Sequence, residues 1–483
     1  MEQEMKDVKQ VKLPMKTKLG YGCGTACDTL PYILFATYFM FFLTDVAGVP
    51  AGIAGSISFI AILVQTVTGP VVAYISDNST NPKGRRIPIL IKSVIPFAIT
   101  TALLFNPIGG SLGLKTAYYA VLAILFLTFY AAYFNVWTAL GAEMTSDYKE
   151  RNSIRSIVAY IAVPLMLLGS SGSIAMVGLF NARGVEYGRS WFYAATVLAI
   201  VMLLGAFTVV KTVKEEPPVL TEEEKAALKE ERLSAKKLIR DYGSFLKLKL
   251  YRKIIIFSLL FVVGYLMMDK SVVYMMVNCL GLGEGQQSLF WVMNTVISTA
   301  CIPLVFGIAN KWDKRKAMFF FTAAYLAGLV IWFVLGMITT VSFVAFVIFS
   351  VPTALGTCAF YSLLYSLMYD CCDVYTLATG EQKEGEMLAL QNLAQTVGEA
   401  IATLFLGWGL QIFGYTGAAN VTPFLQKVIW SFGTIVPGIF VAVSMIFLLG
   451  YNLTRKDFEE VKQAIEDRNE GKEIDMSKFD HLL

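Results

Sequence analysis

The sequence contains few of the side chains that enzymes and metal proteins use for chemistry. It has one histidine, His481, close to the C-terminal end, so the metalloprotease motif H-E-x-x-H is absent. Its seven cysteines include no C-x-x-C pair, and Cys23 and Cys27 are spaced as packing residues on one helix. We therefore expect a protein that is not an enzyme and that holds neither a cofactor nor a metal ion.

Charged residues are also scarce. They make up 16% of the chain, whereas soluble proteins carry about a quarter, and hydrophobic residues make up 56%. This composition excludes an ordinary soluble protein. The net charge of +4 is better explained by contact with anionic lipid headgroups than by nucleic acid, so we expect membrane lipid and no nucleic acid among the partners.

Long apolar runs take the place of the missing polar residues. A helix needs roughly 20 apolar residues to cross the hydrocarbon core, where open strands would leave their backbone unsatisfied. We predict an all-α membrane protein with about twelve transmembrane helices in two six-helix bundles. The runs lie near residues 20–45, 52–76, 87–108, 116–142, 156–181, 190–210, 254–280, 287–309, 317–338, 341–369, 385–413 and 427–451.

One polar stretch, residues 211–253, divides these runs into two sets of six. Pro217 and Pro218 end the preceding helix, and Thr221 followed by Glu224 is a capping-box pattern that predicts an amphipathic helix. We interpret the stretch as a solvated cytoplasmic linker, with a regulatory or docking helix as the alternative. The other expected parts are an N-terminal tail at 1–19, bundles at 20–210 and 254–451, and a C-terminal tail at 452–483.

The charges of the loops predict the orientation. Lys and Arg gather in the loops around Arg85, Arg151 and Lys314, on the same side as both ends of the chain, and are few in the opposite loops. Cytoplasmic loops carry the excess of Lys and Arg in membrane proteins. Both termini are therefore predicted to be cytoplasmic, in a multi-pass protein of the cell membrane.

The two halves resemble each other, and together they resemble a known family. The stretch "SDNSTNPKGRRIPIL" after the second run is echoed by "GIANKWDKRKAMFFF" after the eighth, as in a duplicated six-helix unit. The stretches "TKLGYGCGTACDTLPYILFATYFMFFLTDVAGV", "NVWTALGAEMTSDYKERNSI" and "YDCCDVYTLATGEQKEGEMLALQNLAQTVGEAI" resemble the glycoside-pentoside-hexuronide:cation symporters of the major facilitator superfamily. The resemblance implies a monomeric secondary transporter of a sugar or glycoside that works by alternating access.

The resemblance also implies a binding site. Asp28 matches the aspartate of the first helix that bonds sugar hydroxyls in this family, and Tyr361 and Trp137 match aromatic residues that face the sugar. Aromatic faces and a few polar groups suit a polyol in an apolar pocket. The remaining expected substrate contacts are Tyr32, Asn135, Gln391 and Gln395.

This sequence lacks the charged residues that form the usual cation site of the family. Gln65 and Gly69 stand where cation-coupled members carry two carboxylates, and Thr396 stands in place of a lysine. Sodium needs several oxygen ligands, normally with an anionic one among them. The sequence therefore favours a proton over sodium as the coupling ion.

Three ionisable residues lie at mid-membrane depth in the second half. Glu399 shares a helical stripe with Gln391 and Gln395, and we expect this stripe to line the transport cavity. Asp269 and Lys270 lie on the seventh run, and we expect Lys270 to pair with Glu399. The pair is interpreted as a coupling group, with a role limited to fastening two helices as the alternative. Lys270 would also suit a carboxylate or sulfate on the ligand, so an anionic substrate remains an alternative.

Seven residues at the cytoplasmic loops are candidate gating groups. Acidic and basic side chains there resemble the superfamily's latches between bundles, which bias one of two states. Ordinary interfacial charge is the alternative for each of them. The seven are Asp77, Arg85, Arg86, Glu143, Arg151, Asp370 and Glu384.

Other functions remain open at this point. Within transporters the alternatives are a cation-independent facilitator and an exporter of a non-sugar solute. From another class, a non-transporting receptor or scaffold would keep the bundles and lose the polar cavity.

Overall fold

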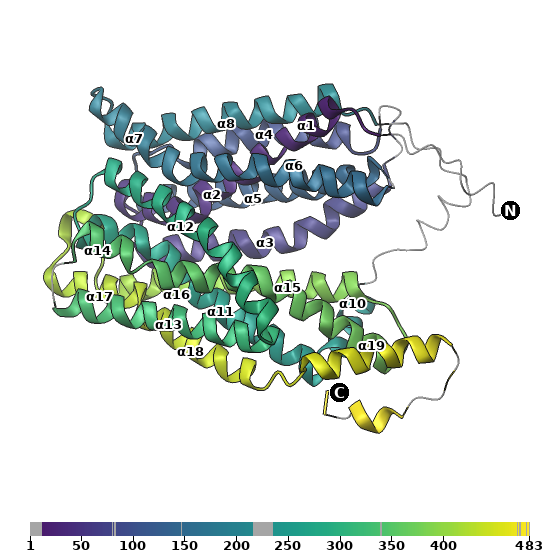
Figure 1. Ribbon diagram of the computed structural model, residues 1–483. Helices are drawn as coiled ribbons and strands as arrows, with labels where there is room; N and C mark the ends of the chain where they lie inside the picture. The colour runs from purple at the N-terminus through teal and green to yellow at the C-terminus, as the bar shows by residue number, and fades with distance from the viewer. Residues whose placement is uncertain are drawn as a thin grey trace. The chain divides into compact units, whose positions relative to one another are not determined.

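All the regular structure of the described chain is helical (Figure 1). The structure is a computed structural model, and it describes the chain except residues 1–11, 80, 82–83, 146, 216–234, 339–340, 471, 473–474, 480 and 483. Pro217, Pro218 and the predicted capping box at Thr221 and Glu224 lie outside the described residues.

Twelve segments in the described part of the chain are long and apolar enough to cross a membrane. The first half holds α1 (Met15–Cys23), α2 (Thr25–Phe41), α3 (Ala51–Asp77), α4 (Ile87–Leu104), α5 (Leu112–Glu143), α6 (Tyr148–Leu167), α7 (Ser173–Ala182) and α8 (Tyr187–Thr212). The first span joins α1, α2 and a wide turn, Phe42–Val46, and the fifth joins α6 and α7 through a similar turn, Leu168–Gly172. The predicted all-α fold is confirmed.

The second half repeats this plan. It holds α11 (Lys249–Tyr274), α12 (Glu284–Lys311), α13 (Lys314–Ile338), α14 (Phe343–Ile348), α15 (Val351–Thr379), α16 (Glu384–Ile412), α17 (Pro423–Gly433) and α18 (Ile435–Leu449). Two helices outside the spans are α10 (Ala235–Phe245) and α19 (Arg455–Asn469). A third wide turn is Met275–Cys279, and two short 3₁₀ turns are Ala418–Asn420 and Met476–Phe479.

The chain forms two compact units. Unit 1 comprises Met1–Phe42 and Val64–Glu230, and unit 2 comprises Leu43–Leu63 and Glu231–Leu483. In unit 1, α4 packs on α5 and α8, and in unit 2, α11 packs on α16 and α18. The end of the first span and the start of the second thus pack with the helices of the second half. The pattern of polar and apolar residues in the sequence does not predict this packing.

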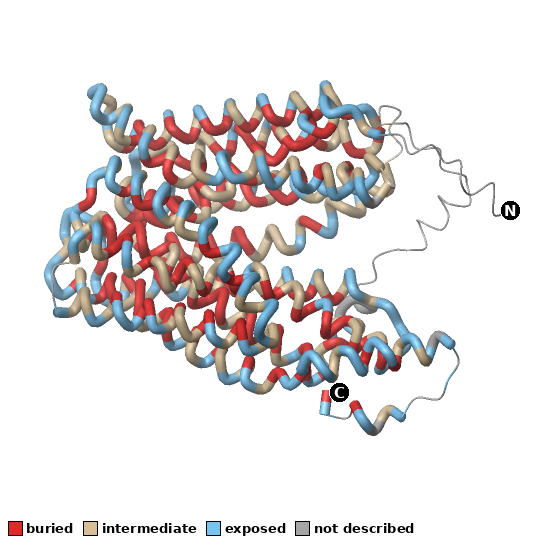
Figure 2. Tube along the Cα trace, viewed as in Figure 1, coloured by how far each residue is buried: buried red, intermediate tan, exposed pale blue. Residues whose placement is uncertain are grey.

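Exposed positions recur along the helices (Figure 2), and many of them carry large apolar side chains. On α8, Val197, Ile200, Leu204 and Phe207 are all exposed and follow one another at intervals of three and four residues. Such a stripe is stable in hydrocarbon and unfavourable in water. The protein is therefore a multi-pass membrane protein.

Candidate functional site

Asp28 is carried by a break in the first span. Gly24 separates α1 from α2, and a β-carbon on it would lie only 2.4 Å from Nε1 of Trp137 on α5. The Tyr133 hydroxyl, also on α5, donates to the Gly24 carbonyl at 3.1 Å. Only a glycine at position 24 permits the first span to approach α5 so closely. This joint sets the position of Asp28 in the first turn of α2.

The half-buried Asp28 carboxylate lies beside two tyrosines. The Tyr130 hydroxyl donates to Asp28 Oδ1 at 2.9 Å, and the Tyr130 ring stacks on that of Tyr32 with centroids 5.0 Å apart. Sequence reasoning missed Tyr130. Its position seven residues before Trp137, two turns away on the same helix face, is the signal that could have identified it.

Trp137 is a buried packing residue in this structure, whereas the sequence suggests that it faces the substrate. It is 5% exposed, its ring stacks on Tyr21, and its indole N–H donates to the Tyr21 carbonyl at 3.2 Å. The ring is thus enclosed by packing against α1 and does not present a face for a ligand. Its contacts instead hold in place the joint at Gly24 that precedes Asp28.

Neutral residues meet where α3 approaches α5. A β-carbon on Gly69 would lie 3.2 Å from Asn135 Nδ2, and this amide already donates to the Ala131 carbonyl at 2.8 Å. Gln65 lies half-buried one turn earlier on α3. Gln65, Gly69 and Asn135 thus contribute no carboxylate to this region.

In unit 2, Lys270 on α11 and Glu399 on α16 form a buried ion pair. Nζ and Oε1 are 3.4 Å apart, and the side chains are 5% and 8% exposed. The two helices come close because Gly398 has no side chain: a β-carbon there would lie 3.2 Å from the Leu259 carbonyl oxygen. Charges removed from water in this way depend on each other for stability.

Gln391 and Gln395 lie two turns and one turn before Glu399 on α16. Gln391 is fully buried and donates to the Ser258 hydroxyl, so it faces α11 rather than an open cavity. Gln391 Oε1 and Gln395 Nε2 are buried without a hydrogen-bond partner among the described residues. The exposed Tyr361 ring lies on α15, at 6.0 Å from the ring of Tyr265.

Arg86 organises the loop end of unit 1. It donates to Asp77 Oδ1 at 2.5 Å and to Glu143 Oε1 at 2.7 Å, and Arg85 donates to the same Glu143 oxygen at 2.9 Å. Burial would lower the pKa of the Arg86 guanidinium, but these hydrogen bonds outweigh burial and raise its pKa. Four of the seven candidate gating residues thus form one cluster.

Glu215, which sequence reasoning missed, fastens the same loop. Its carboxylate accepts the backbone N–H groups of Arg85 and Arg86, both at 2.8 Å, and of Ile87 at 2.9 Å. These groups stand at the start of α4, where a helix has unpaired donors and favours negative charge. Glu215 lies 130 residues from Arg85 in the chain, and no local sequence pattern predicts the contact.

Gly84→Ala is expected to lower the free energy of unfolding by about 1 to 3 kcal/mol. Gly84 has φ +102°, and a β-carbon there would lie 2.2 Å from Glu215 Oε2, which the helix start holds in place. Thermal unfolding in detergent measures the effect. Gly184→Ala is the control, because its φ of +87° imposes backbone strain with nothing within 4 Å of the new carbon. Equal losses for both variants would show that the Glu215 contact contributes nothing.

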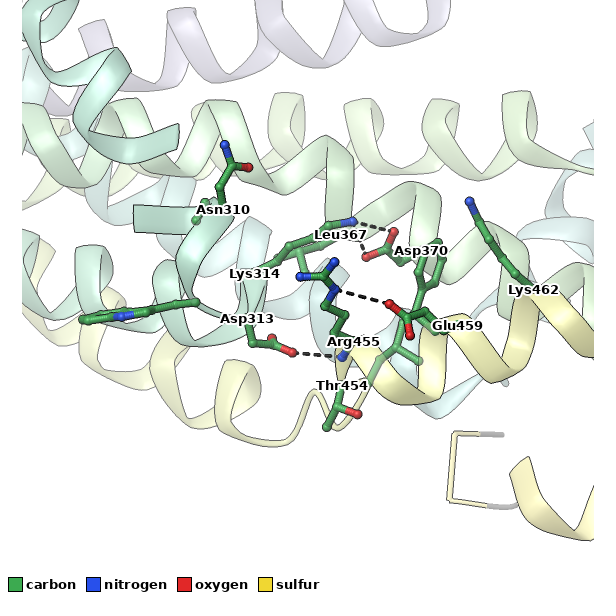
Figure 3. A pocket seen from close by; sticks show the side chains of 13 residues that line it. Asn310, Asp313, Lys314, Leu367, Asp370, Thr454, Arg455, Glu459 and Lys462 are labelled. Atoms are coloured by element: carbon green, nitrogen blue, oxygen red, sulfur yellow. Dashed lines mark hydrogen bonds and ion pairs between the residues drawn. The ribbon is translucent and has the colours of Figure 1, made fainter. Parts of the chain in front are cut away.

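The corresponding end of unit 2 holds Asp370 (Figure 3). Lys314 Nζ lies 2.8 Å from both Asp370 carboxylate oxygens, beside a cavity of about 460 Å³. The backbone N–H of Arg455, at the start of α19, donates to Asp313 Oδ2 at 3.0 Å. Arg455 follows the last span of the second half and bonds the loop after the second span of that half. Glu215 makes the equivalent contact in the first half.

The two remaining gating candidates are placed separately. Arg151 donates to the carbonyls of Thr145 at 2.8 Å and Ala142 at 3.3 Å, so it caps the end of α5. Glu384 is exposed in the first turn of α16. Arg151 belongs to unit 1, and Glu384 and Asp370 belong to unit 2.

The twelve spans have the fold of solved transporters of the major facilitator class. The inward-open xylose transporter XylE from E. coli matches with a TM-score of 0.58 and 14% identity, covering 93% of this chain and 98% of that one. A bacterial homologue of the human lysosomal transporter Spinster matches with a TM-score of 0.62 and 12% identity, covering 93% and 97%. At these identities the likeness shows the fold alone.

The chain belongs to the family described as "MFS/sugar transport protein", whose profile matches residues 20–455, the family of the glycoside-pentoside-hexuronide:cation symporters. It is therefore a transporter and not an enzyme. The inner membrane symporter YicJ of Escherichia coli is 24% identical over 95% of this chain and 96% of that protein. The isoprimeverose transporter of Lactiplantibacillus pentosus is 21% identical over 92% and 90%. A proposed 2,3-dihydroxypropane-1-sulfonate exporter of Salmonella typhimurium is 23% identical over 97% and 99%.

Proposed function

We propose that this protein moves a sugar, glycoside or hexuronide across the cell membrane by alternating access, in symport with protons, with both termini in the cytoplasm. Asp28, Tyr32 and Tyr130 bind hydroxyl groups and one sugar face from unit 1. Tyr361, Gln395 and the Lys270–Glu399 pair act from unit 2. Asn135 and Gln391 support these contacts.

The observation that carries the proposal is the buried Lys270–Glu399 pair, with Gln395 one turn before Glu399 on α16. Buried polar atoms in native proteins are nearly always paired, so the unpartnered Gln395 Nε2 calls for a partner. A hydroxylated ligand supplies both donors and acceptors. An ion pair in the membrane interior is moreover a functional group by default.

Proton coupling is favoured by the same pair and by the neutral residues of α3. We propose that Glu399 carries the proton, with Lys270 3.4 Å away as its partner. A substrate that separates the two side chains would link its own binding to that of the proton and so couple the two fluxes. An acidic substrate would bind Lys270 directly, so hexuronides remain within the proposal.

An imposed sodium gradient is expected to leave accumulation at the level found without any gradient. Gln65 and Gly69 provide no carboxylate for the ion. Uptake of radiolabelled sugars, glycosides and hexuronides into membrane vesicles, with an imposed proton or sodium gradient at fixed pH, measures this. Accumulation driven by sodium alone would show a cation site in other residues.

The same vesicles separate the competing functions. A cation-independent facilitator equilibrates substrate without accumulating it under either gradient. An exporter accumulates substrate only in vesicles of inverted orientation. A receptor or scaffold binds ligand and carries none across.

A further inference from the structure

The polar stretch between the two halves of the chain ends in α10, which packs on other helices of unit 2 (Figure 1). The ring of Phe245, the buried last residue of α10, lies 5.2 Å between centroids from Tyr375 on α15 and 6.3 Å from Tyr251 on α11. The Ser244 and Tyr375 hydroxyl oxygens are 3.4 Å apart. These contacts fix the end of α10 beside the start of α11. We call residues 240–252 the basic elbow.

The basic elbow lies in a strongly positive stretch of sequence. Residues 236–253 include seven Lys and Arg residues and one acidic residue, Asp241. The Asp241 carboxylate pairs with Lys383 at 3.4 Å, and Lys383 also pairs with Glu381 at 3.0 Å. The single acidic group of the stretch is therefore engaged with a lysine from another part of unit 2.

Four basic residues of the elbow are exposed. None of them forms an ion pair with another residue in the described part of the chain; they are Arg240, Lys247, Lys249 and Arg252. Lys253, by contrast, is half-buried and donates to the Gly450 carbonyl at 2.6 Å. The four exposed cationic groups are therefore available to an anion from outside the protein.

The packing of the elbow keeps its charged face open. Arg240, Gly243 and Lys247 are exposed at intervals of three and four residues, as on one face of a helix. The Lys247 N–H donates to the Ser244 carbonyl at 3.1 Å, so the helical path continues past the end of α10. A β-carbon on Gly243 would meet nothing within 4 Å, whereas Leu248 is buried. Apolar residues thus anchor the elbow, and its charges face outward.

The elbow lies where the seventh span enters the membrane. This span, Lys249–Cys279, has 31 residues. A helix of this length is about 46 Å long, whereas the hydrocarbon core is about 30 Å thick. The first turn of α11, with Lys249 and Arg252, therefore lies at the level of the lipid headgroups. Anionic headgroups attract basic residues at this level, with a gain in affinity of about fivefold for each residue.

We propose that Arg240, Lys247, Lys249 and Arg252 form a binding surface for the headgroups of anionic phospholipids in the surrounding bilayer. Lysine and arginine side chains donate charged hydrogen bonds to the lipid phosphate. An anionic lipid offers this phosphate without the compensating amine of a zwitterionic lipid. The bound lipid fastens the end of the linker to the membrane at the start of the second half. This surface lies within unit 2, and its lipid binding requires neither a transported substrate nor a coupling ion.

Energy transfer to labelled lipids measures which lipids gather at the elbow. In the full-length protein without its seven native cysteines, a fluorophore on Gly243→Cys lies in the open space beside the charged face. The protein is placed in nanodiscs of phosphatidylcholine and phosphatidylglycerol, and an acceptor dye is attached to the acyl chain of one lipid or the other at equal mole fraction. The local concentration of phosphatidylglycerol is expected to exceed that of phosphatidylcholine about fivefold, which we call the enrichment.

Removal of the charges and addition of salt both test the elbow. Lys247→Gln with Lys249→Gln is expected to lower the enrichment to about twofold or less. Further substitution of Arg240→Gln and Arg252→Gln should abolish it. An increase in salt from about 0.1 to about 1 M, which shortens the screening length from about 10 to about 3 Å, should also abolish it in the unsubstituted elbow. The salt test requires no substitution in the elbow, so it decides the result even where a variant fails to fold.

A matched pair of lysines outside the elbow is the control. Lys456 and Lys472 are exposed and pair with Glu460 and Glu470, at 3.6 and 2.6 Å. Lys456→Gln with Lys472→Gln removes the same formal charge and is expected to leave the enrichment unchanged. An equal loss in this control would show that net charge alone attracts the lipid. Equal transfer to both lipids at low salt, with the elbow intact, would likewise overturn the proposal.

Discussion

Asp28→Asn is expected to weaken substrate binding about ten- to a hundredfold while the protein remains folded in the membrane. A hydrogen bond to a charged group contributes about 1.5 to 3 kcal/mol, and each 1.4 kcal/mol is a factor of ten in affinity. The amide keeps the shape of the carboxylate and loses its charge, so the Tyr130 contact at 2.9 Å survives in weaker form. Equilibrium binding of radiolabelled glycoside to the purified protein measures the change.

The controls for Asp28 separate binding from folding. Tyr130→Phe leaves the carboxylate in place without its hydroxyl partner and should weaken binding less than Asp28→Asn does. Glu186→Gln neutralises an exposed carboxylate at the start of α8 and should leave affinity unchanged. Unaltered affinity in Asp28→Asn would remove this residue from the binding site and leave it as a partner of Tyr130 alone.

Glu399→Gln is expected to abolish proton-driven accumulation and to spare exchange of substrate across the membrane. Without the Glu399 carboxylate beside Lys270, substrate binding is no longer linked to proton binding at this pair, and coupling is lost. Accumulation under a proton gradient should fall to the equilibrium level, while counterflow with substrate on both sides stays within about threefold, because the amide still fills the site.

The alternative role of the pair gives a different result. Removing one charge of a buried pair costs about 3 to 5 kcal/mol, since the other charge is left unpaired. If Glu399 only fastens α11 to α16, Glu399→Gln should lower the unfolding temperature and reduce exchange and accumulation equally. Lys270→Met combined with Glu399→Gln removes both charges and should then recover stability and transport together. Normal accumulation in Glu399→Gln would end the coupling proposal.

The sequence indicated the outline of this protein because the membrane imposes simple rules. Twelve runs of apolar residues predicted twelve spans, since a helix of fixed rise must cross a layer of fixed thickness. The motifs around Asp28 and Glu399 are enough to indicate the family without the structure. The proximity of Lys270 and Glu399 also followed, because an isolated charge in hydrocarbon needs a partner and few were available.

Side-chain direction was much harder to infer. Trp137 and Gln391 carry suitable chemistry on suitable spans, yet one is enclosed against Tyr21 and the other against Ser258. A rotation of a helix by a few tens of degrees decides whether such a side chain faces a ligand or a neighbouring helix. Hydrophobic periodicity defines that rotation poorly in a membrane, where lipid and protein interior are both apolar.

The sequence by itself thus determined the helical fold, the family and the absence of the usual carboxylates at Gln65 and Gly69. Only the tertiary structure decided which distant residues meet. Tyr130 lies 102 residues from Asp28, and Tyr415 lies 370 residues from Asp45. Such contacts depend on how closely two helices approach, which glycines such as Gly24 and Gly407 permit to within backbone contact. That approach is a property of packed surfaces, and no single stretch of sequence contains it.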